Sequence, residues 1–527
     1  MSKRQKNGIS LIVLIITIIV IIILTGTVVL NLSQNNPILN ANEASVKSTI
    51  DAYKSDISMT LSKKYIADSA YNPNNLNAVA WDGNDLNITG SVKEYIPSMT
   101  STDGANYIIQ KGKLIYNGTD TNSIIWAQDS GIEDSKISDY VVSKGVNKPK
   151  LATGMTAKKW NTSTLVWDTI ASPDTDTSWY DYPTKQWANA QTADGSMWVW
   201  IPRYVYNILT ANWHTATAGT VNIQFSKGTN DSWNGAIDLG VTAASSNFTT
   251  NGGKFTNHSA FTLGITELTG LWVAKFEASG TVSAVDVKPG IASLRSTTVD
   301  AMFTASRNME TNTRYGWTAT GVGIDTHLMK NTEWGAVAYL SSSVYGKTGE
   351  VWINPNSNFL TGQAGTTVSS GATTVTYAYN DLTYGINAST TGNISGIYDM
   401  SGGAWEYTAA YVNNGHSNLT TYGLSLVNAA SQYKDEYASN GDTQSGNYTS
   451  NLNKKGDAVY ETSTSGTGAT AWFGDYTYMP YSSRPFFIRG GSYADTTIAG
   501  AFSFYNSNGN AHGDIGFRPV VSVAGSL

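Results

Sequence analysis

Two carboxylates flank a run of small residues in the stretch YDMSGGAWEY, late in the chain. Asp399 and Glu406 can supply side-chain oxygens, while Gly402 and Ala404 let the backbone turn so that its carbonyl oxygens face inward. Carboxylate and carbonyl oxygens are the ligands that a hard cation such as calcium prefers. The same spacing is compatible with a plain glycine turn into a strand, with Trp405 in the core and Glu406 at the surface.

Other motifs accompany this stretch in a fixed order. MWVWIPRYVY, GLWVAKFEASG and LMKNTEWGAVAYL precede it, and FFIRGGSY and IGFRPVV follow it. Together they resemble the formylglycine-generating enzyme family (sulfatase-modifying factor domains) from about residue 149 to the end of the chain. The resemblance implies a C-type-lectin-like fold with much irregular backbone over small antiparallel sheets. It also implies a structural calcium ion, held at Asp399, Gly402, Ala404 and Glu406, the middle two through their carbonyls.

The chemistry of the family's prototype is excluded here. That enzyme oxidises its substrate through two of its own cysteines, which bind copper, and this chain has no cysteine. Another branch of the family holds iron in a three-histidine site, but none of the five histidines here is paired as HxxxH or HxE. We therefore predict that the domain is not an enzyme. A metal-dependent oxidoreductase of the same fold, with histidines that converge from distant positions, is the alternative.

The composition favours many short strands and long ordered loops. Of 527 residues, 14% are charged and 11% are aromatic, and the formal net charge is −6. This balance offers no basic face, so we expect no binding of nucleic acid. A polar surface rich in Tyr and Trp suits contact with a ligand. The length predicts two or three domains.

The N-terminus combines a basic leader (residues 1–8) with an uncharged apolar run (residues 9–30). Such a run is long enough to span a bilayer as a helix, and the basic residues before it predict a cytoplasmic N-terminus. The pattern resembles a type IV prepilin, which implies cleavage between Gly8 and Ile9 and contact with other pilin-like subunits. Val13 stands where pilins generally carry a glutamate that assists filament assembly, so an unprocessed membrane anchor is the alternative.

Residues 31–145 are expected to form a helix packed on a small sheet, which is also the arrangement of a pilin head. The apolar residues of this helix recur at near-helical spacing, namely Val46, Ile50, Tyr53, Ile57 and Leu61. The stretch YIIQKGKLIYNG predicts a hairpin that turns at residues 111–112. The segment SKGVNKPK, which ends at Lys150, predicts a linker to a large domain at residues 146–527.

Apolar runs locate strands in the large domain. MWVWIPRYVY predicts a strand closed by Pro202 with Arg203 as a buried structural partner, and GLWVAKFEASG predicts a central strand. Residues 301–310 predict a short helix. Segments 222–257, 354–376 and 416–470 are rich in Gly, Asn, Ser and Thr, which indicates surface insertions. Four tryptophans are expected to be core and loop-stapling aromatics rather than a sugar cradle: Trp160, Trp167, Trp179 and Trp187.

The C-terminal segment between IRGG and IGFRP has the composition of a binding surface. It combines rigid aromatic rings with small amides that make adaptable hydrogen bonds. The residues predicted to bind a ligand are Tyr493, Asp495, Thr496, Phe504, Tyr505, Asn506, Asn508, Asn510 and His512. Related lectin-fold proteins vary the same segment through diversity-generating retroelements, so the resemblance makes it a candidate for diversification. An ordinary turn-rich loop would have a similar composition.

These observations predict an α+β protein with an N-terminal transmembrane helix, a small pilin-like domain and a large C-type-lectin-like domain. The expected function is recognition, as an adhesin or minor-pilin-like protein that binds a surface protein or a glycan. The expected location is the bacterial cell surface, with the chain anchored by a single span or assembled in an extracellular filament. A structural filament or envelope subunit without a ligand is the other alternative.

Overall fold

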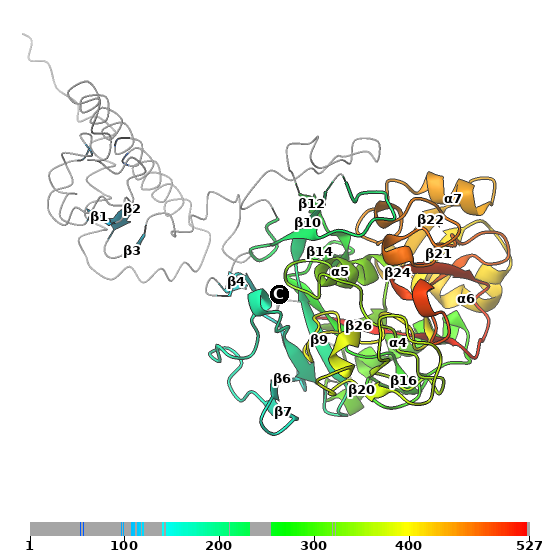
Figure 1. Ribbon diagram of the computed structural model, residues 1–527, viewed down its shortest axis with the longest axis horizontal. Helices are drawn as coiled ribbons and strands as arrows, with labels where there is room; N and C mark the ends of the chain where they lie inside the picture. The colour runs from blue at the N-terminus through cyan, green and yellow to red at the C-terminus, as the bar shows by residue number, and fades with distance from the viewer. Residues whose placement is uncertain are drawn as a thin grey trace, which may run out of the picture. The chain divides into compact units, whose positions relative to one another are not determined.

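The computed structural model describes residues 144–209, 211–231, 255–318, 320–321 and 323–523, together with positions 53, 56, 96, 99, 107–110, 113–116, 119–120 and 140–141 (Figure 1). The chain divides into two compact units, Met1–Ser138 and Asp139–Leu527. In the first unit, β1 (Tyr107–Gln110), β2 (Lys113–Tyr116) and β3 (Thr119–Asp120) form an antiparallel sheet. The hairpin expected at residues 111–112 is therefore confirmed.

A seven-stranded antiparallel sheet forms one side of the second unit. Its strands in spatial order are β18 (Ile324–Leu328), β26 (Pro519–Val523), β15 (Gly270–Ala274), β9 (Met197–Pro202), β8 (Asn189–Gln191), β6 (Thr156–Asn161) and β7 (Val166–Thr169). The chain enters the sheet at one edge through β6 and β7, and its last strand, β26, lies between β15 and β18.

The centre of this sheet forms from the two most apolar runs of the sequence. β9 and β15 are buried along their whole lengths, as expected for strands that are covered on both faces. Trp272 lies directly opposite Trp200 in the register, with the two ring centroids 5.2 Å apart. A Cβ atom at Gly270 would lie 2.3 Å from the Trp200 ring, so only glycine fits beside that indole. The expected central strand and the strand that ends at Pro202 are both confirmed.

A second, five-stranded sheet carries the C-terminal motifs. Its strands are β22 (Asp435–Ala438), β21 (Trp405–Asn413), β23 (Phe486–Gly490) and β24 (Gly500–Ser507), with β25 (Ile515–Phe517) pairing to β21. β21 pairs in parallel with β22 and β25, and antiparallel with β23. The motifs around Trp405, Arg489 and Phe517 therefore lie on neighbouring strands of one sheet.

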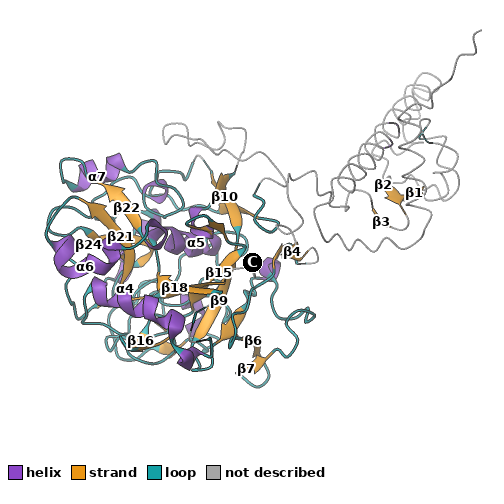
Figure 2. Cartoon of the chain, turned by 180° about the vertical axis from the view of Figure 1, so that it is seen from behind, coloured by secondary structure: helices purple, strands orange, loops and turns teal. Residues whose placement is uncertain are grey.

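Four α-helices occur among the described residues of the second unit: α4 (Val299–Asn308), α5 (Asn331–Ser341), α6 (Asn418–Asn428) and α7 (Gln444–Ser450). α5 is buried at every position, and Figures 1 and 2 both show it between the two sheets. Glu333, the third residue of α5, caps the start of the helix, because its carboxylate accepts a hydrogen bond from the Lys330 backbone N–H at 2.8 Å. α4 confirms the short helix expected at residues 301–310.

Short two- and three-stranded sheets complete the second unit. They are formed by β10 (Tyr204–Ile208) with β11 (Val221–Phe225) and β12 (Thr256–Asn257), β13 (Thr262–Leu263) with β14 (Thr266–Glu267), β16 (Ser279–Thr281) with β17 (Ala284–Asp286), β19 (Gln363–Ala364) with β20 (Tyr377–Ala378), and β4 (Tyr140–Val141) with β5 (Val146–Asn147).

The expected fold class is corrected in one respect. We expected an α+β chain that begins with a membrane-spanning helix. Across the part of the chain that the structure describes, no helix is long and apolar enough to cross a membrane. The longest α-helices there have 11 residues, against the roughly 20 that a span requires, and strands predominate. Residues 9–30, where the span was expected, lie outside the described residues, as do Gly8 and most of the helix expected around Tyr53.

Two further expectations differ from the structure. The linker expected up to Lys150 contains β5, whose Asn147 side chain is fully buried and donates to the backbone oxygens of Gly228 and Thr269. The insertion expected at residues 416–470 contains α6, β22 and α7. The polar composition of this segment concealed its helices and strand, because buried Asn side chains there bond to backbone groups.

Candidate ligand-binding face

Asp399, the first residue of the expected calcium motif, is buried and already surrounded by donors. Its carboxylate accepts a hydrogen bond from Asn354 Nδ2 at 2.8 Å and from the Gly362 backbone N–H, which lies 2.9 Å from both oxygens. Its backbone has φ of +60°, a left-handed conformation that turns the carboxylate inward. Asp399 therefore organises the loop that contains residues 354–362.

Glu406 pairs with an arginine from the last motif of the chain. Arg518 Nη2 lies 2.6 Å from Glu406 Oε1, and Arg518 Nε lies 3.1 Å from Oε2, so the contact is bidentate. The guanidinium also donates to the backbone oxygens of Ala274 and Tyr398. Both side chains are buried, and together they join β21 to the turn between β25 and β26.

A third carboxylate, Glu277, belongs to the same cluster. Its oxygens accept hydrogen bonds from the Ala404 backbone N–H at 2.8 Å and from the Ser293 hydroxyl. Burial raises the pKa of Glu277 well above its usual value, and the charges of Asp399 and Glu406 raise it further. Burial likewise raises the pKa of Glu406 to about 7, although Arg518 opposes the shift.

This arrangement does not fit a calcium ion. Calcium takes six to eight oxygens directed at one point. Here the oxygens of Asp399 and Glu406 are directed at protein donors, and the N–H of Ala404 faces Glu277. The guanidinium of Arg518 supplies the positive charge. Within the described ranges, no group of three or more His, Asp or Glu side chains is arranged to hold a metal.

The predicted ligand-binding residues of β24 divide between the two faces of the sheet. Side chains alternate along a strand, so Phe504 and Asn506 point to one face and Tyr505 to the other. Phe504 is fully buried and packs against Phe487, and Asn506 is 4% exposed. Tyr505 is half-buried and lies at the surface. Phe504 and Asn506 are therefore core residues that a ligand does not reach.

Tyr505 belongs to a cluster of rings that the sequence did not reveal. The segment at residues 476–478 runs beside β24, with Tyr478 N donating to Phe504 O and Phe504 N donating to Tyr476 O, both at 2.8 Å. Tyr505 lies 4.9 Å from Tyr478, 6.0 Å from Tyr476 and 5.6 Å from Trp405, between ring centroids. We call Trp405, Tyr476, Tyr478 and Tyr505 the aromatic face.

The aromatic face has a buried base and an accessible outer layer. Trp405 is 7% exposed, whereas the three tyrosines are half-buried. The signal for the two tyrosines that were missed is the alternation YTY at residues 476–478, which places both rings on one side of an extended segment. Trp405, in the stretch YDMSGGAWEY, therefore packs beneath the surface tyrosine Tyr505.

The loop before β24 holds three other predicted residues, all half-buried. Tyr493 packs edge-on against Phe359, with ring centroids 4.7 Å apart. The Asp495 carboxylate accepts a hydrogen bond from the Ser492 backbone N–H at 2.7 Å, and its charge raises the pKa of Tyr476 beyond the effect of desolvation. Thr496 begins a short 3-10 helix with φ of +50°. Asp495 thus lies beside the aromatic face, whereas Tyr493 contacts a different loop.

The turn after β24 contains the last three predicted residues. His512 Nε2 lies 3.0 Å from Asn508 Oδ1, which also accepts from the Asn510 backbone N–H at 3.1 Å. The Tyr407 hydroxyl donates to the Asn510 backbone oxygen at 3.1 Å. All three residues are half-buried. Their side chains make the turn itself and leave part of their surface to solvent.

The other histidines are separated in the fold. His327 contacts Asp325 and Glu333, and His258 is buried between Tyr204 and Tyr206. His214 stacks on Tyr460 with ring centroids 4.2 Å apart, while His416 Nδ1 accepts a hydrogen bond from the Asn418 backbone N–H. Each of these histidines thus has its own local contact.

Comparison with known proteins gives no match, either to a model of a protein family or to a curated protein. The resemblance to the formylglycine-generating enzyme family therefore stays a prediction from the quoted motifs.

Proposed function

We propose that this chain is a recognition protein, adhesin-like or minor-pilin-like, whose second unit is catalytically silent and binds a surface ligand through its C-terminal end. The observation that carries the proposal is the aromatic face, in which the half-exposed Tyr505 of β24 packs against Trp405 and against two half-exposed tyrosines of the neighbouring segment, Tyr476 and Tyr478. Tyrosine offers a large amphipathic contact area at low entropic cost, which is why it is frequent in binding surfaces.

The surroundings of the aromatic face add polar groups at its edge. Asp495 lies beside Tyr476, and Asn508, Asn510 and His512 follow β24 directly. Rings with a charged side chain such as Asp495 beside them match the anatomy of protein interfaces. We propose a ligand at a cell surface, either a protein or a glycan.

The architecture of β24 also supports diversification of this segment by a retroelement. Tyr505 is the one half-exposed side chain of β24 and packs against other rings of the aromatic face, whereas side chains such as Phe504 fill the core. A half-exposed position such as Tyr505 is expected to tolerate substitution without loss of the fold. Variation would accordingly concentrate at Tyr505, Asn508 and Asn510 and spare Phe504 and Asn506.

The proposal is tested by binding of the full chain to a panel of intact bacterial and host cells, measured by flow cytometry. We expect the chain to bind at least one cell type. Tyr478→Ala should then weaken binding about 5- to 30-fold, the effect of removing one interface tyrosine worth about 1–2 kcal/mol. The matched control is Tyr384→Ala, because Tyr384 is half-buried against Tyr377 in another loop. An equal loss of cell binding in Tyr478→Ala and Tyr384→Ala would contradict the proposal.

A further inference from the structure

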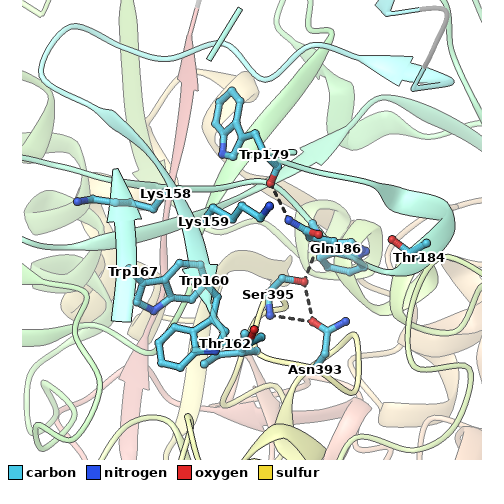
Figure 3. A pocket seen from close by; sticks show the side chains of 12 residues that line it. Lys158, Lys159, Trp160, Thr162, Trp167, Trp179, Thr184, Gln186, Asn393 and Ser395 are labelled. Atoms are coloured by element: carbon cyan, nitrogen blue, oxygen red, sulfur yellow. Dashed lines mark hydrogen bonds between the residues drawn. The ribbon is translucent and has the colours of Figure 1, made fainter. Parts of the chain in front are cut away.

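A pocket of about 320 Å³ lies at the edge of the seven-stranded sheet, where β6 and β7 form a hairpin (Figure 3). Figures 1 and 2 both show β6 and β7 on the side of the second unit opposite to β24. The pocket is therefore separate from the aromatic face. Its volume is at the lower end of the 300–1,000 Å³ typical of ligand pockets, which suits a ligand of one or two rings.

Four tryptophans line this pocket. Trp160 and Trp167 are directly opposite each other in the β6–β7 register, half-buried, with ring centroids 5.4 Å apart. Trp179 and Trp187 are each 1% exposed and belong to the core. The expectation of core and loop-stapling aromatics is confirmed for Trp179 and Trp187, and also for Trp167, whose indole N–H donates to the Tyr379 hydroxyl at 3.2 Å. Trp160 and Trp167 are half-buried and keep surface that a ligand can contact.

The walls of the pocket are fixed by hydrogen bonds. The indole N–H groups of Trp179 and Trp187 donate to the backbone oxygens of Asn189 and Tyr345, at 2.9 and 2.8 Å. Gln186 Nε2 donates to the backbone oxygen of Trp179 at 3.1 Å, which Figure 3 shows. A pocket whose side chains are already held in place loses little entropy when it binds a ligand.

Three polar groups in the pocket are left available. The Lys159 ammonium, the Gln186 amide oxygen and the Thr162 hydroxyl make no hydrogen bond or ion pair with any residue in the described ranges, although the charge of Lys159 helps to lower the pKa of the Asp176 carboxylate. In Figure 3 the Lys159 side chain extends toward Gln186, across the pocket from the Trp160 and Trp167 rings. Lys159 offers three donor hydrogens, Gln186 offers an acceptor, and a threonine hydroxyl offers both.

We propose that this pocket binds a pyranose sugar. A pyranose has an apolar C–H face, which packs on an indole ring, and hydroxyl groups, which need donors and acceptors around its rim. The pocket provides indole surface from Trp160 and Trp167 and polar groups from Lys159, Gln186 and Thr162. The Lys159 ammonium also suits the carboxylate of an acidic sugar. This site goes beyond the proposed function, because it does not depend on the aromatic face.

The test uses the full chain and a panel of sugars: the methyl glycosides of glucose, galactose and N-acetylglucosamine as neutral probes, and glucuronic acid and N-acetylneuraminic acid as acidic probes. Binding is measured by saturation-transfer NMR and by titration of tryptophan fluorescence. We expect at least one sugar to bind at millimolar concentration. Lys159→Ala and Trp167→Ala should each weaken that binding about tenfold, the loss of roughly one strong contact.

Control variants separate this site from others. Trp352→Ala removes a half-buried tryptophan outside the pocket, and Tyr478→Ala alters the aromatic face; both should leave sugar affinity unchanged. Near-UV circular dichroism verifies that Lys159→Ala is folded. Weaker sugar binding by that variant then reports the loss of a contact with the sugar. Preference for the acidic probes would show that Lys159 pairs with a carboxylate.

Three outcomes would overturn the proposal. The first is that no sugar of the panel binds at millimolar concentration. The second is sugar binding that Lys159→Ala and Trp167→Ala leave intact while Tyr478→Ala abolishes it. The third is that the pocket variants lose binding of a protein ligand while no sugar binds to the wild type. That result would show that the pocket binds a protein side chain.

Discussion

At the scale of single residues, Arg518 is the cation in a buried cluster of carboxylates. Three buried carboxylates, those of Glu277, Asp399 and Glu406, lie around the start of β21, and the Arg518 guanidinium is in bidentate contact with Glu406. Buried charges are stable only when they are paired and hydrogen-bonded. The motifs that resemble a calcium site are thereby explained as an arginine–carboxylate cluster that ties β21 to the C-terminal turn.

Replacement of Arg518 should therefore be strongly destabilising. Arg518→Met keeps the length of the side chain but leaves Glu406 buried without its partner, which typically costs about 3–5 kcal/mol. Urea unfolding followed by circular dichroism measures the effect. Arg484→Met is the matched control, because Arg484 is exposed, and it should stay within about 0.5 kcal/mol of wild type. Equal stability of the two variants would show that Arg518 does not hold the cluster.

Calcium should have no effect on this cluster. Because protein N–H groups already occupy the oxygens of Asp399 and Glu406, we expect the same melting temperature in calcium and in a chelator. Differential scanning calorimetry of the full chain in both solutions makes the comparison. A melting temperature raised by calcium in wild type but not in Asp399→Asn would restore the calcium site that the family resemblance implies.

His327 provides a pH-dependent contribution to stability. Burial alone would lower the pKa of this imidazole, but the charge of Glu333 and hydrogen bonds to Asp325 and Glu333 outweigh burial and raise the pKa to about 9. Burial alone would raise the pKa of Glu333, but the charges of His327 and Lys330 outweigh it and lower the pKa to about 2. The stabilisation by His327 is complete below its unfolded pKa of about 6.5 and is lost as pH rises through 9.

The pH dependence of unfolding tests this contribution. The stabilisation by Glu333 is complete above its unfolded pKa of about 4.3 and is lost as pH falls toward 2. The difference in unfolding free energy between wild type and His327→Gln should thus be largest between about pH 4.5 and 6.5, on the order of 3 kcal/mol, and shrink above about pH 8. A difference that is constant from pH 5 to 10 would contradict the assigned contacts.

At the scale of elements, neighbouring residues of β24 have different roles. Phe504 is buried and stabilises the fold, whereas the half-exposed Tyr505 is proposed to contact the ligand. Phe504→Ala removes a fully buried ring and should cost about 3–5 kcal/mol. Tyr505→Ala removes a half-exposed ring and should change stability by about 1 kcal/mol or less while it weakens ligand binding. Thermal melts and cell binding of both variants test the contrast. Comparable destabilisation by the two substitutions would indicate that β24 does not present Tyr505 at the surface.

The elements that could be predicted from the sequence are those with strong local signals. β9 and β15 follow from continuous apolar runs, and the β1–β2 hairpin follows from two short runs around a turn. The two faces of β24 could not be assigned, because FSFYN carries an aromatic ring on both faces and only the contact with Phe487 selects the inner one. The pairing of Glu406 with Arg518 depends on strands that meet only in the folded sheet.

At the scale of the whole molecule, the second unit carries two candidate sites at opposite sides, the aromatic face at β24 and the tryptophan pocket at β6 and β7 (Figures 1 and 2). Sites that share no residues are expected to act independently. The changes in unfolding free energy caused by substitutions at the two sites should therefore be additive within about 0.5 kcal/mol. A rigid frame of two sheets with binding surfaces at separate ends suits a protein that contacts more than one ligand.

The central claim is that the aromatic face contacts the ligand, and the most direct measurement is footprinting of tyrosines. The full chain is labelled by hydroxyl radicals, free and bound to the cell type that it recognises, and modified tyrosines are quantified by mass spectrometry. We predict that binding protects Tyr476, Tyr478 and Tyr505, while labelling of Tyr384 is unchanged. Unchanged labelling of all three tyrosines on bound protein would show that the ligand binds elsewhere.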